Sequence, residues 1–275
     1  MLQMLKRMMR MAAICVAAIL FVSCASLSTS GVGRVKRYEL VSERLPQNFD
    51  GCDIAFISDT HYPSKFTRKR LARVVRKLRQ LQPQMLLLGG DYVTSDEYIE
   101  ELFDSLSSVK TLYGTYAVLG NHERSRAEAV EEAMRLHNVH LLRDEAVALT
   151  GESTLFIVGV EDSFKVDTLA PLRGAAMPDS AFVILLAHTP DYAQRAAVQA
   201  DIVLSGHTHG GQVTLLGLYA PVTNSLYGHR FLSGLNCTTQ GVPVITTNGI
   251  GTSRRKIRFC APSEIVLITL RRATN

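Results

Sequence analysis

The run GHTHGGQ at positions 206–212 contains two histidines whose spacing could bind a metal ion. His207 and His209 are one residue apart, and the flanking glycines leave the backbone free to direct both imidazoles into one small volume. Two histidines on an exposed strand would have the same spacing without binding anything. The pair therefore predicts a metal site only if other parts of the chain supply further ligands.

Four more apolar runs end in side chains that commonly bind metals. They end at Asp59-Thr60-His61, at Gly90-Asp91, at Gly120-Asn121-His122-Glu123 and at His188. Each residue alone has an ordinary explanation, since an aspartate can cap a helix, an asparagine can hold a turn and a histidine can be a hydrogen-bonded core residue. Together with His207 and His209, however, five of the eight histidines follow apolar runs of this kind. The set as a whole indicates a metal centre.

Buried strands must position these side chains. The five runs are 52–58, 85–88, 115–119, 181–187 and 201–204, and all are apolar on both faces, which is typical of sheets covered on both sides. In α/β sheets, ligands bind beyond the carboxyl ends of the strands. Helices are expected over 67–80, 96–107 and about 125–137, and further strands over 35–45, 139–142, 145–149, 154–160 and 264–270.

The motifs occur in the order of a known family. DTH at 59–61, GD at 90–91, GNHE at 120–123, His188 and GHTH at 206–209 together resemble the calcineurin-like metallophosphoesterases. The longer GHTHGGQ run and the segment 248–270 are similar to the bacterial, membrane-attached branch. The resemblance implies an α/β fold, a four-layer αββα sandwich of two mixed sheets flanked by helices. The alternating strands after residue 139 would then form the second sheet.

The resemblance also implies two divalent metal ions. One ion would be bound by Asp59, His61, Asp91 and His209, and the other by Asp91, Asn121, His188 and His207. Asp91 would bridge them, because a carboxylate can offer one oxygen to each of two cations. Nitrogen and oxygen ligands without thiolate suit Mn, Fe or Zn, and the ligand types do not choose among these metals. His122 would be the catalytic acid for the leaving oxygen rather than a ligand.

The expected activity is metal-dependent phosphate-ester hydrolysis. By resemblance, a metal-bound hydroxide would attack the phosphorus of a phosphodiester or pyrophosphate in an envelope lipid or cell-wall substrate. A phosphomonoesterase is the alternative, and a non-catalytic binding domain on the same fold is a further one, although no ligand of the pattern is missing. The expected partners are therefore a phosphate-containing small molecule or lipid, and no protein partner is predicted.

The N-terminus has the composition of a targeting segment. Residues 1–23 contain Lys6, Arg7 and Arg10 but no acid, and an uncharged, mostly apolar run of 12 residues spans 11–22, too short for a typical membrane helix. The sequence around Cys24 resembles a bacterial lipobox, so we expect a lipoprotein anchored at Cys24 outside the cytoplasm. An ordinary signal peptide and an uncleaved anchor are the alternatives.

The length of the chain indicates its domain organisation, and its net charge bears on the partners it can bind. The chain has 275 residues, of which 47% are hydrophobic, enough for one large core. We expect a signal peptide or anchor over 1–23, a tether over 24–34 and one metallophosphoesterase domain over 35–275. The net charge is +5, and the N-terminal segment supplies three of these charges, so the remainder is too mild to indicate nucleic acid binding.

Several surface assignments stay open at this point. Beyond the N-terminal segment, Cys52, Cys237 and Cys260 allow at most one disulfide, so at least one thiol should be a small buried residue. The basic helix at 65–79 could lie against anionic lipid or simply be solvated. The cluster Arg254, Arg255, Lys256 and Arg258 could contact phosphates or lipid headgroups, or form a charged turn. Tyr62 and Tyr92 could line the site or pack in the core.

Overall fold

The computed structural model describes residues 32–63, 66–149, 154–161, 177–195 and 200–273. The predicted N-terminal segment, most of the predicted tether and Cys24 lie outside these residues. In the part of the chain that is described, no helix combines the length and the hydrophobicity needed to cross a bilayer.

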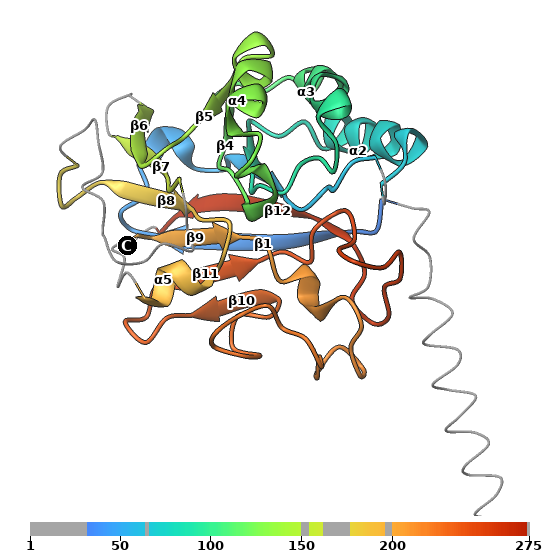
Figure 1. Ribbon diagram of the computed structural model, residues 1–275. Helices are drawn as coiled ribbons and strands as arrows, with labels where there is room; N and C mark the ends of the chain where they lie inside the picture. Colours follow the sequence, from blue (N-terminus) through green and yellow to red (C-terminus); the bar gives the residue numbers. More distant parts are fainter. Residues whose placement is uncertain (1–31, 64–65, 150–153, 162–176, 196–199, 274–275) are drawn as a thin grey trace, which may run out of the picture.

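Two six-stranded sheets form the centre of the molecule (Figure 1). The first has the order β1 (Arg34–Ser42), β12 (Glu264–Arg272), β2 (Asp53–Ile57), β3 (Met85–Leu88), β4 (Thr115–Ala117) and β5 (Val139–Leu141). The second has the order β10 (Gly234–Cys237), β11 (Pro243–Thr246), β9 (Ile202–Ser205), β8 (Phe182–Leu186), β7 (Leu155–Gly159) and β6 (Glu145–Leu149). Both sheets are mixed, because β12 runs antiparallel to β2, while β6 and β10 run antiparallel to their neighbours.

Three helices cover the outer face of the first sheet (Figure 1). They are α2 (Arg68–Leu81), α3 (Ile99–Ser107) and α4 (Ala127–Leu136), and short 3₁₀ turns lie at Gln47–Phe49, Asp96–Tyr98, Asn121–Glu123 and His209–Gly211. The helix α2 begins where the Thr67 side chain accepts a hydrogen bond from the Arg70 amide, and it buries an apolar stripe that includes Leu71 and Leu78.

Three apolar clusters follow the layers. One lies between α2 to α4 and the first sheet, one between the two sheets, and one on the outer face of the second sheet. Alternate residues of one strand separate into different clusters, as with Ala55 outside and Phe56 between the sheets. Among the described residues, the outer layer of the second sheet contains the short helix α5 (Asp191–Arg195). The predicted α/β fold of two mixed sheets with flanking helices is confirmed.

One expected assignment is wrong. The strand expected over 139–142 forms as β5, but it pairs in parallel with β4 at the edge of the first sheet instead of joining the second. The helix α4 connects these two strands, so that they form a parallel crossover unit on one sheet. The second sheet begins only at β6, after the turn at Asp144, whose φ is 52°.

Candidate metal centre

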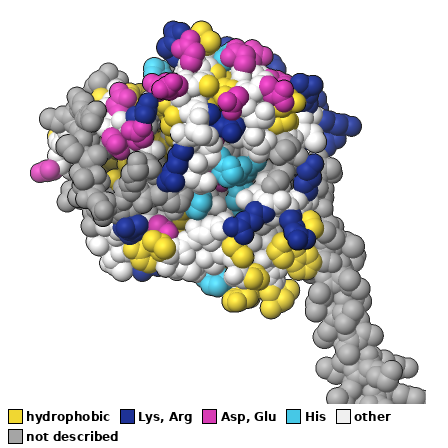
Figure 2. Space-filling view, viewed as in Figure 1, with side chains coloured by type: hydrophobic (Ala, Val, Ile, Leu, Met, Phe, Trp, Pro, Cys, Tyr) yellow, Lys and Arg dark blue, Asp and Glu magenta, His cyan; other side chains and the backbone are white. Residues whose placement is uncertain are grey.

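Five parallel strands deliver the predicted side chains to one place. The strands β2, β3 and β4 are neighbours in the first sheet, and β8 and β9 are neighbours in the second. The predicted residues follow the carboxyl end of each strand, and hydrogen bonds join consecutive loops, such as the one from the Asp59 amide to the Gly90 carbonyl at 2.9 Å. Figure 2 shows histidine side chains gathered near the middle of this face.

The first group of side chains is Asp59, His61 and His209. Their candidate ligand atoms lie within 4.8 Å of one another. The Nε2 atoms of His61 and His209 are 3.1 Å apart, and His209 Nε2 is 3.4 Å from Asp59 Oδ1. Because all three side chains are buried, one carboxylate and two imidazoles converge in a space from which bulk water is excluded.

The second group is Asp91, His188 and His207, and its ligand atoms also lie within 4.8 Å of one another. His188 Nε2 is 3.4 Å from Asp91 Oδ2, while its other ring nitrogen, Nδ1, is 2.7 Å from the Gly89 carbonyl oxygen. A hydrogen bond of this kind is typical of metal-binding histidines, since it fixes the ring and the tautomer.

Asp91 links the two groups. Its Oδ2 atom is 3.7 Å from His61 Nε2 in the first group and 3.4 Å from His188 Nε2 in the second. Its other oxygen, Oδ1, accepts a hydrogen bond from the His122 amide at 3.0 Å. One buried carboxylate therefore faces both clusters of ligands, which is the arrangement that a bridging ligand requires.

The donor set fits divalent metal ions. The Asn121 side-chain oxygen is buried and makes no hydrogen bond to any of the described residues. A buried amide oxygen without a partner is costly, and a cation would satisfy it. Together with the two clusters, this gives an array of carboxylate, imidazole and amide donors without thiolate, which suits first-row transition metals.

Charge and burial set the protonation of the cluster. Burial raises the pKa of the Asp59 carboxyl to about 6, against the charge of His188. Burial lowers the pKa of His207 to about 3 and holds the pKa of His209 well below its usual value. For His188, burial opposes the charged form, but the carboxylate of Asp91 raises its pKa to about 10. His207 and His209 are therefore neutral at pH 7, the form that binds metals.

His122 differs from the other histidines in its exposure. Its side chain is 46% exposed, and its Nε2 lies 3.9 Å from Asp91 Oδ2. The ring meets the His61 ring edge to face, with 4.7 Å between centroids. His122 therefore lies at the mouth of the cluster, where it can contact a bound molecule while the other histidines stay buried.

The sequence did not predict the supporting role of two residues beside this cluster. The buried Glu123 carboxylate accepts hydrogen bonds from the amides of Asp91, Tyr92 and Gly120 at 2.8, 2.9 and 2.9 Å, so it joins the loops after β3 and β4. Burial raises its pKa to about 7. The glutamate at the end of the GNHE motif, Glu123, was the sequence feature from which this supporting role could have been predicted.

Arg258 is the second supporting residue, and its expected surface position is wrong. Its guanidinium is buried and donates to the carbonyl oxygens of His209 at 3.0 Å, Gly251 at 3.0 Å and Ala261 at 2.9 Å. Burial lowers its pKa to about 9. The peptide carbonyls of these loops lack sheet partners and draw the guanidinium inward, whereas the neighbouring Arg254 remains exposed.

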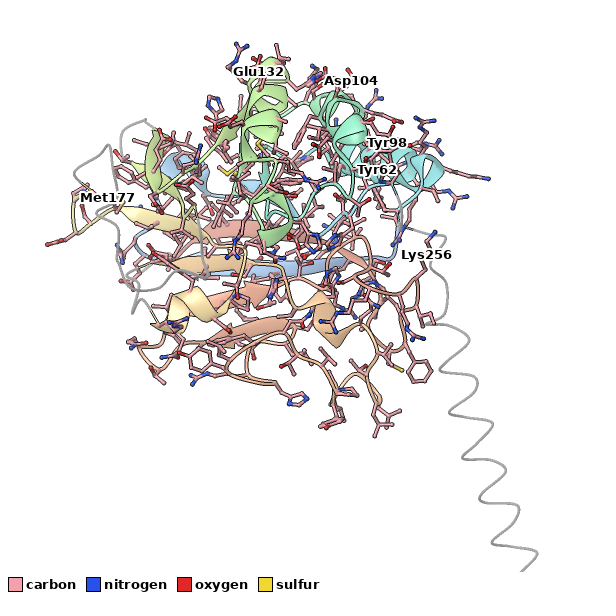
Figure 3. The ribbon with its side chains drawn as sticks, in the orientation of Figure 1. Tyr62, Tyr98, Asp104, Glu132, Met177 and Lys256 are labelled. Atoms are coloured by element: carbon pink, nitrogen blue, oxygen red, sulfur yellow. The ribbon has the colours of Figure 1, made fainter. Side chains whose placement is uncertain are left out.

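The two tyrosines near the motifs are packing residues. Tyr62 is fully buried, and its ring packs edge to face against Tyr98 with centroids 5.6 Å apart (Figure 3). Tyr92 is also buried, and its hydroxyl donates to the Val118 carbonyl at 2.7 Å. Neither side chain lines the mouth of the cluster.

Comparison with known proteins gives matches over most of the chain. Residues 53–211 match the family model described as calcineurin-like phosphoesterase. An uncharacterized metallophosphoesterase of Aquifex aeolicus is 30% identical over 88% of this chain and 93% of its own length. The uncharacterized metallophosphoesterase YkuE of Bacillus subtilis is 26% identical over 86% of this chain and 85% of its own length. Phosphodiesterase YaeI of Escherichia coli is 28% identical over 85% and 88%, respectively.

Proposed function

This chain belongs to the calcineurin-like phosphoesterase family, and on that premise we propose that it hydrolyses a phosphodiester or pyrophosphate bond in an envelope lipid or cell-wall substrate. The reaction would use two divalent metal ions. The observation that carries the proposal is the position of Asp91, whose Oδ2 faces a histidine of each cluster at 3.7 and 3.4 Å.

The cluster residues would hold the ions as the family pattern implies. Asp59, His61, Asp91 and His209 would bind one ion, and Asp91, Asn121, His188 and His207 the other. When bound, such ions neutralise phosphate charge and lower the pKa of a coordinated water.

His122 supplies the proton of the reaction. A new oxygen–phosphorus bond forms to water while the bond from phosphorus to the leaving oxygen breaks, and that oxygen needs a proton. The exposed imidazole of His122 can reach it, since it lies at the mouth of the cluster. The buried histidines keep their rings fixed, as His188 does through Gly89.

The choice of a diester or pyrophosphate is supported by the relatives and by the N-terminus. One relative with similar coverage is named a phosphodiesterase. The apolar run over 11–22 would deliver the domain over 35–275 to the outside of the cytoplasmic membrane, where lipid-linked and cell-wall phosphates are found. We propose that residues 24–34 tether the domain to a lipid on Cys24.

The reaction is tested by comparing three substrates at one fixed Mn²⁺ concentration. These are bis-p-nitrophenyl phosphate, p-nitrophenyl phosphate and a lipid-linked pyrophosphate, with Fe²⁺ and Zn²⁺ in parallel. The proposal expects a higher kcat/KM for the diester or the pyrophosphate than for the monoester. A preference for the monoester would make the chain a phosphomonoesterase, and no turnover with any metal would make it a non-catalytic domain.

The anchor is tested separately from the reaction. Metabolic labelling with palmitate should mark the wild-type chain, and Cys24→Ala should abolish the label without affecting hydrolysis by the purified protein. A label that persists in Cys24→Ala would contradict lipidation at this residue. An unlabelled wild-type chain that still fractionates with membranes would indicate an uncleaved anchor.

A further inference from the structure

Exposed hydrophobic side chains gather on one segment beside the metal centre. Leu218 is 80% exposed and Leu226 is 74% exposed, values at which a large aliphatic side chain is almost entirely in water. The exposed hydrophobic residues of this segment are Val213, Leu215, Leu216, Leu218, Tyr219, Val222, Leu226 and Tyr227. A contiguous set of this size is unusual on a soluble surface and indicates an interaction site. We call residues 213–227 the apolar loop.

A basic segment lies directly against the apolar loop. The Thr214 amide donates to the Phe259 carbonyl at 2.9 Å, and the Phe259 amide donates to the Gln212 carbonyl at 2.9 Å. The Gln212 side chain also donates to the Arg255 carbonyl at 3.0 Å. Residues 253–259, which we call the basic loop, therefore share one surface with the apolar loop.

The basic loop exposes its charges at the edge of this surface. Arg254, Arg255 and Lys256 are exposed, and Ile257 beside them is exposed as well. Figure 3 labels Lys256 on the loop at the right-hand edge of the molecule, and Figure 2 shows Lys and Arg side chains beside hydrophobic ones in that region, next to the histidines.

The charge of this region has one sign only. Residues 202–263 contain no Asp or Glu, whereas they contain five Lys and Arg residues, of which Arg254, Arg255 and Lys256 are exposed on the basic loop. The Asp191 carboxylate, which accepts hydrogen bonds from the Ser225 hydroxyl and the Leu226 amide of the apolar loop, is buried beneath it. An apolar surface whose two loops expose only cationic charges is complementary to a lipid surface that presents anionic headgroups above acyl chains. A protein partner of ordinary composition would offer both signs of charge.

A cavity connects this surface to the metal centre. It has a volume of about 300 Å³ and lies between the two loops. His209 and Thr208 line one part of it, while Val222 and Ile257 line another together with Arg254. A molecule held at the apolar surface would therefore lie next to the candidate ligand His209.

The N-terminal end of the described chain lies at the same side. The Arg34 amide donates to the Ser263 carbonyl at 2.9 Å, and a side chain at Gly33 would overlap that carbonyl. Ser263 follows the basic loop by only four residues. The 31 residues that precede the described chain, with their apolar run over 11–22, therefore continue from a point close to this surface.

We propose that the apolar loop and the basic loop dock on an anionic lipid bilayer. The leucines would enter the boundary between headgroups and acyl chains, and Arg254, Arg255 and Lys256 would meet the lipid phosphates. Docking would place the metal centre at the level of the headgroups. The inference does not depend on which bond the metal centre hydrolyses, because the surface is formed by residues outside the cluster.

The absence of tryptophan from the sequence allows a direct test on the full chain. Leu218→Trp would place a single fluorescent reporter on the apolar loop. Leu112→Trp is the matched control, since Leu112 is 74% exposed but lies just before β4, at the opposite end of that strand from the metal centre. Emission would be recorded with phosphatidylglycerol vesicles, with phosphatidylcholine vesicles and with brominated lipids as quenchers.

The proposal expects the Leu218→Trp emission to shift to shorter wavelength and to be quenched by brominated lipid in phosphatidylglycerol vesicles, with weaker effects in phosphatidylcholine. The Leu112→Trp emission should not change, even if the N-terminus holds the chain on the vesicle. An unchanged Leu218→Trp spectrum, or equal changes in both variants, would overturn the proposal. If the Leu218→Trp emission shifts without vesicles, and the shift grows with protein concentration, the surface binds a second copy of the chain instead of a bilayer.

Charge variants of Leu218→Trp test the role of the basic loop. Arg254→Gln with Arg255→Gln should raise the phosphatidylglycerol concentration for half-maximal shift at least about tenfold, since each basic side chain near an anionic surface favours binding roughly fivefold. Arg76→Gln with Arg79→Gln on α2 is the matched control and should have little effect. A larger effect of the α2 variant than of the basic-loop variant would assign the lipid contact to α2 and overturn the proposal.

Discussion

Most of the candidate ligands have an unfavourable backbone conformation. Asp59, His61, Asp91, His207 and His209 all have φ between 46° and 67°, the left-handed region that few residues other than glycine adopt. Such a conformation costs about 1–3 kcal/mol per residue and persists only where the surroundings fix it. Here hydrogen bonds between loops do so, for example from the His61 amide to the Asp91 carbonyl at 3.1 Å. Five of the thirteen described non-glycine residues with positive φ are therefore candidate ligands, which supports their functional assignment.

His122 should affect the reaction and not the metal content. His122→Ala is expected to retain both metal ions but to lower kcat by about 10²- to 10⁴-fold, because it removes an acid at the mouth and no buried ligand. Metal analysis and steady-state kinetics on the same preparation would check this. His188→Ala is the control and should lose metal. Loss of metal from His122→Ala would make His122 a ligand.

Arg258 should position His209 through its hydrogen bonds to backbone carbonyls. Arg258→Lys keeps the charge but cannot donate to the loops at 209, 251 and 261 together, so the affinity for metal should fall by about 10- to 100-fold. Metal titration followed by calorimetry would measure it. Arg255→Lys is the control, since that side chain is exposed. Equal affinities in both variants would contradict the positioning role.

Residue types indicated the ligands but not their supports. His188 was identifiable because it is one of five histidines that follow buried runs and because it falls in the order of the family pattern. Glu123 and Arg258 act on backbone groups, and any carboxylate or guanidinium could do this from many positions in the sequence. The sequence pattern around Arg258 suggested solvent, because three of its neighbours are basic. Only the tertiary fold shows which loop carbonyls meet at the Arg258 guanidinium.

At the level of the elements, close contact between two loops depends on a glycine. A side chain at Gly206, after β9, would overlap Asp59 Oδ2 and Ser58 Oγ. Gly206→Ala should therefore lower metal content and activity together, because it displaces a candidate ligand. Gly241→Ala is the control, since nothing lies within 4 Å of an added side chain there, although its φ of 87° adds strain. Normal metal content in Gly206→Ala would show that the loops can separate without harm.

The thiols should react according to the elements that contain them. Cys52 is buried beside β2, and burial raises its pKa to about 12, so very little thiolate is present at pH 8. Cys237 in β10 is exposed. A disulfide reagent at pH 8 should modify Cys237 in the native protein and Cys52 only after unfolding, as mapped by peptide mass spectrometry. Rapid native modification of Cys52 would contradict its place between the sheets.

The boundaries of a strand could be predicted where its hydrophobic pattern was compatible with only one kind of element. The runs that became β2, β3 and β8 are apolar on both faces, and the predicted bounds differ from the observed ones by at most one residue. Which sheet a strand joins depends on long-range pairing instead. The short strand β5 has no local feature that distinguishes pairing with β4 from pairing with β6, so its assignment to the second sheet was wrong.

At the scale of the molecule, the candidate metal centre lies at the junction of the two sheets. Asp59, His61, Asp91 and Asn121 follow strands of the first sheet, whereas His188, His207 and His209 follow strands of the second. Each cluster contains a residue from both sheets. Metal ions would therefore crosslink the layers at one edge, in addition to the apolar cluster that fills the space between them.

Metal removal should consequently lower thermal stability. A ligand at 100 times its Kd stabilises the folded state by about 2.7 kcal/mol, and for a domain of this size that corresponds to roughly 5–10 °C in Tm. Treatment with EDTA followed by calorimetry should show such a decrease, and added Mn²⁺ or Zn²⁺ should reverse it. His188→Ala, which cannot complete its cluster, should respond less. If the wild-type Tm stays constant while elemental analysis shows that metal has been removed, the ions do not crosslink the sheets, and the layers are held together by their apolar contacts alone.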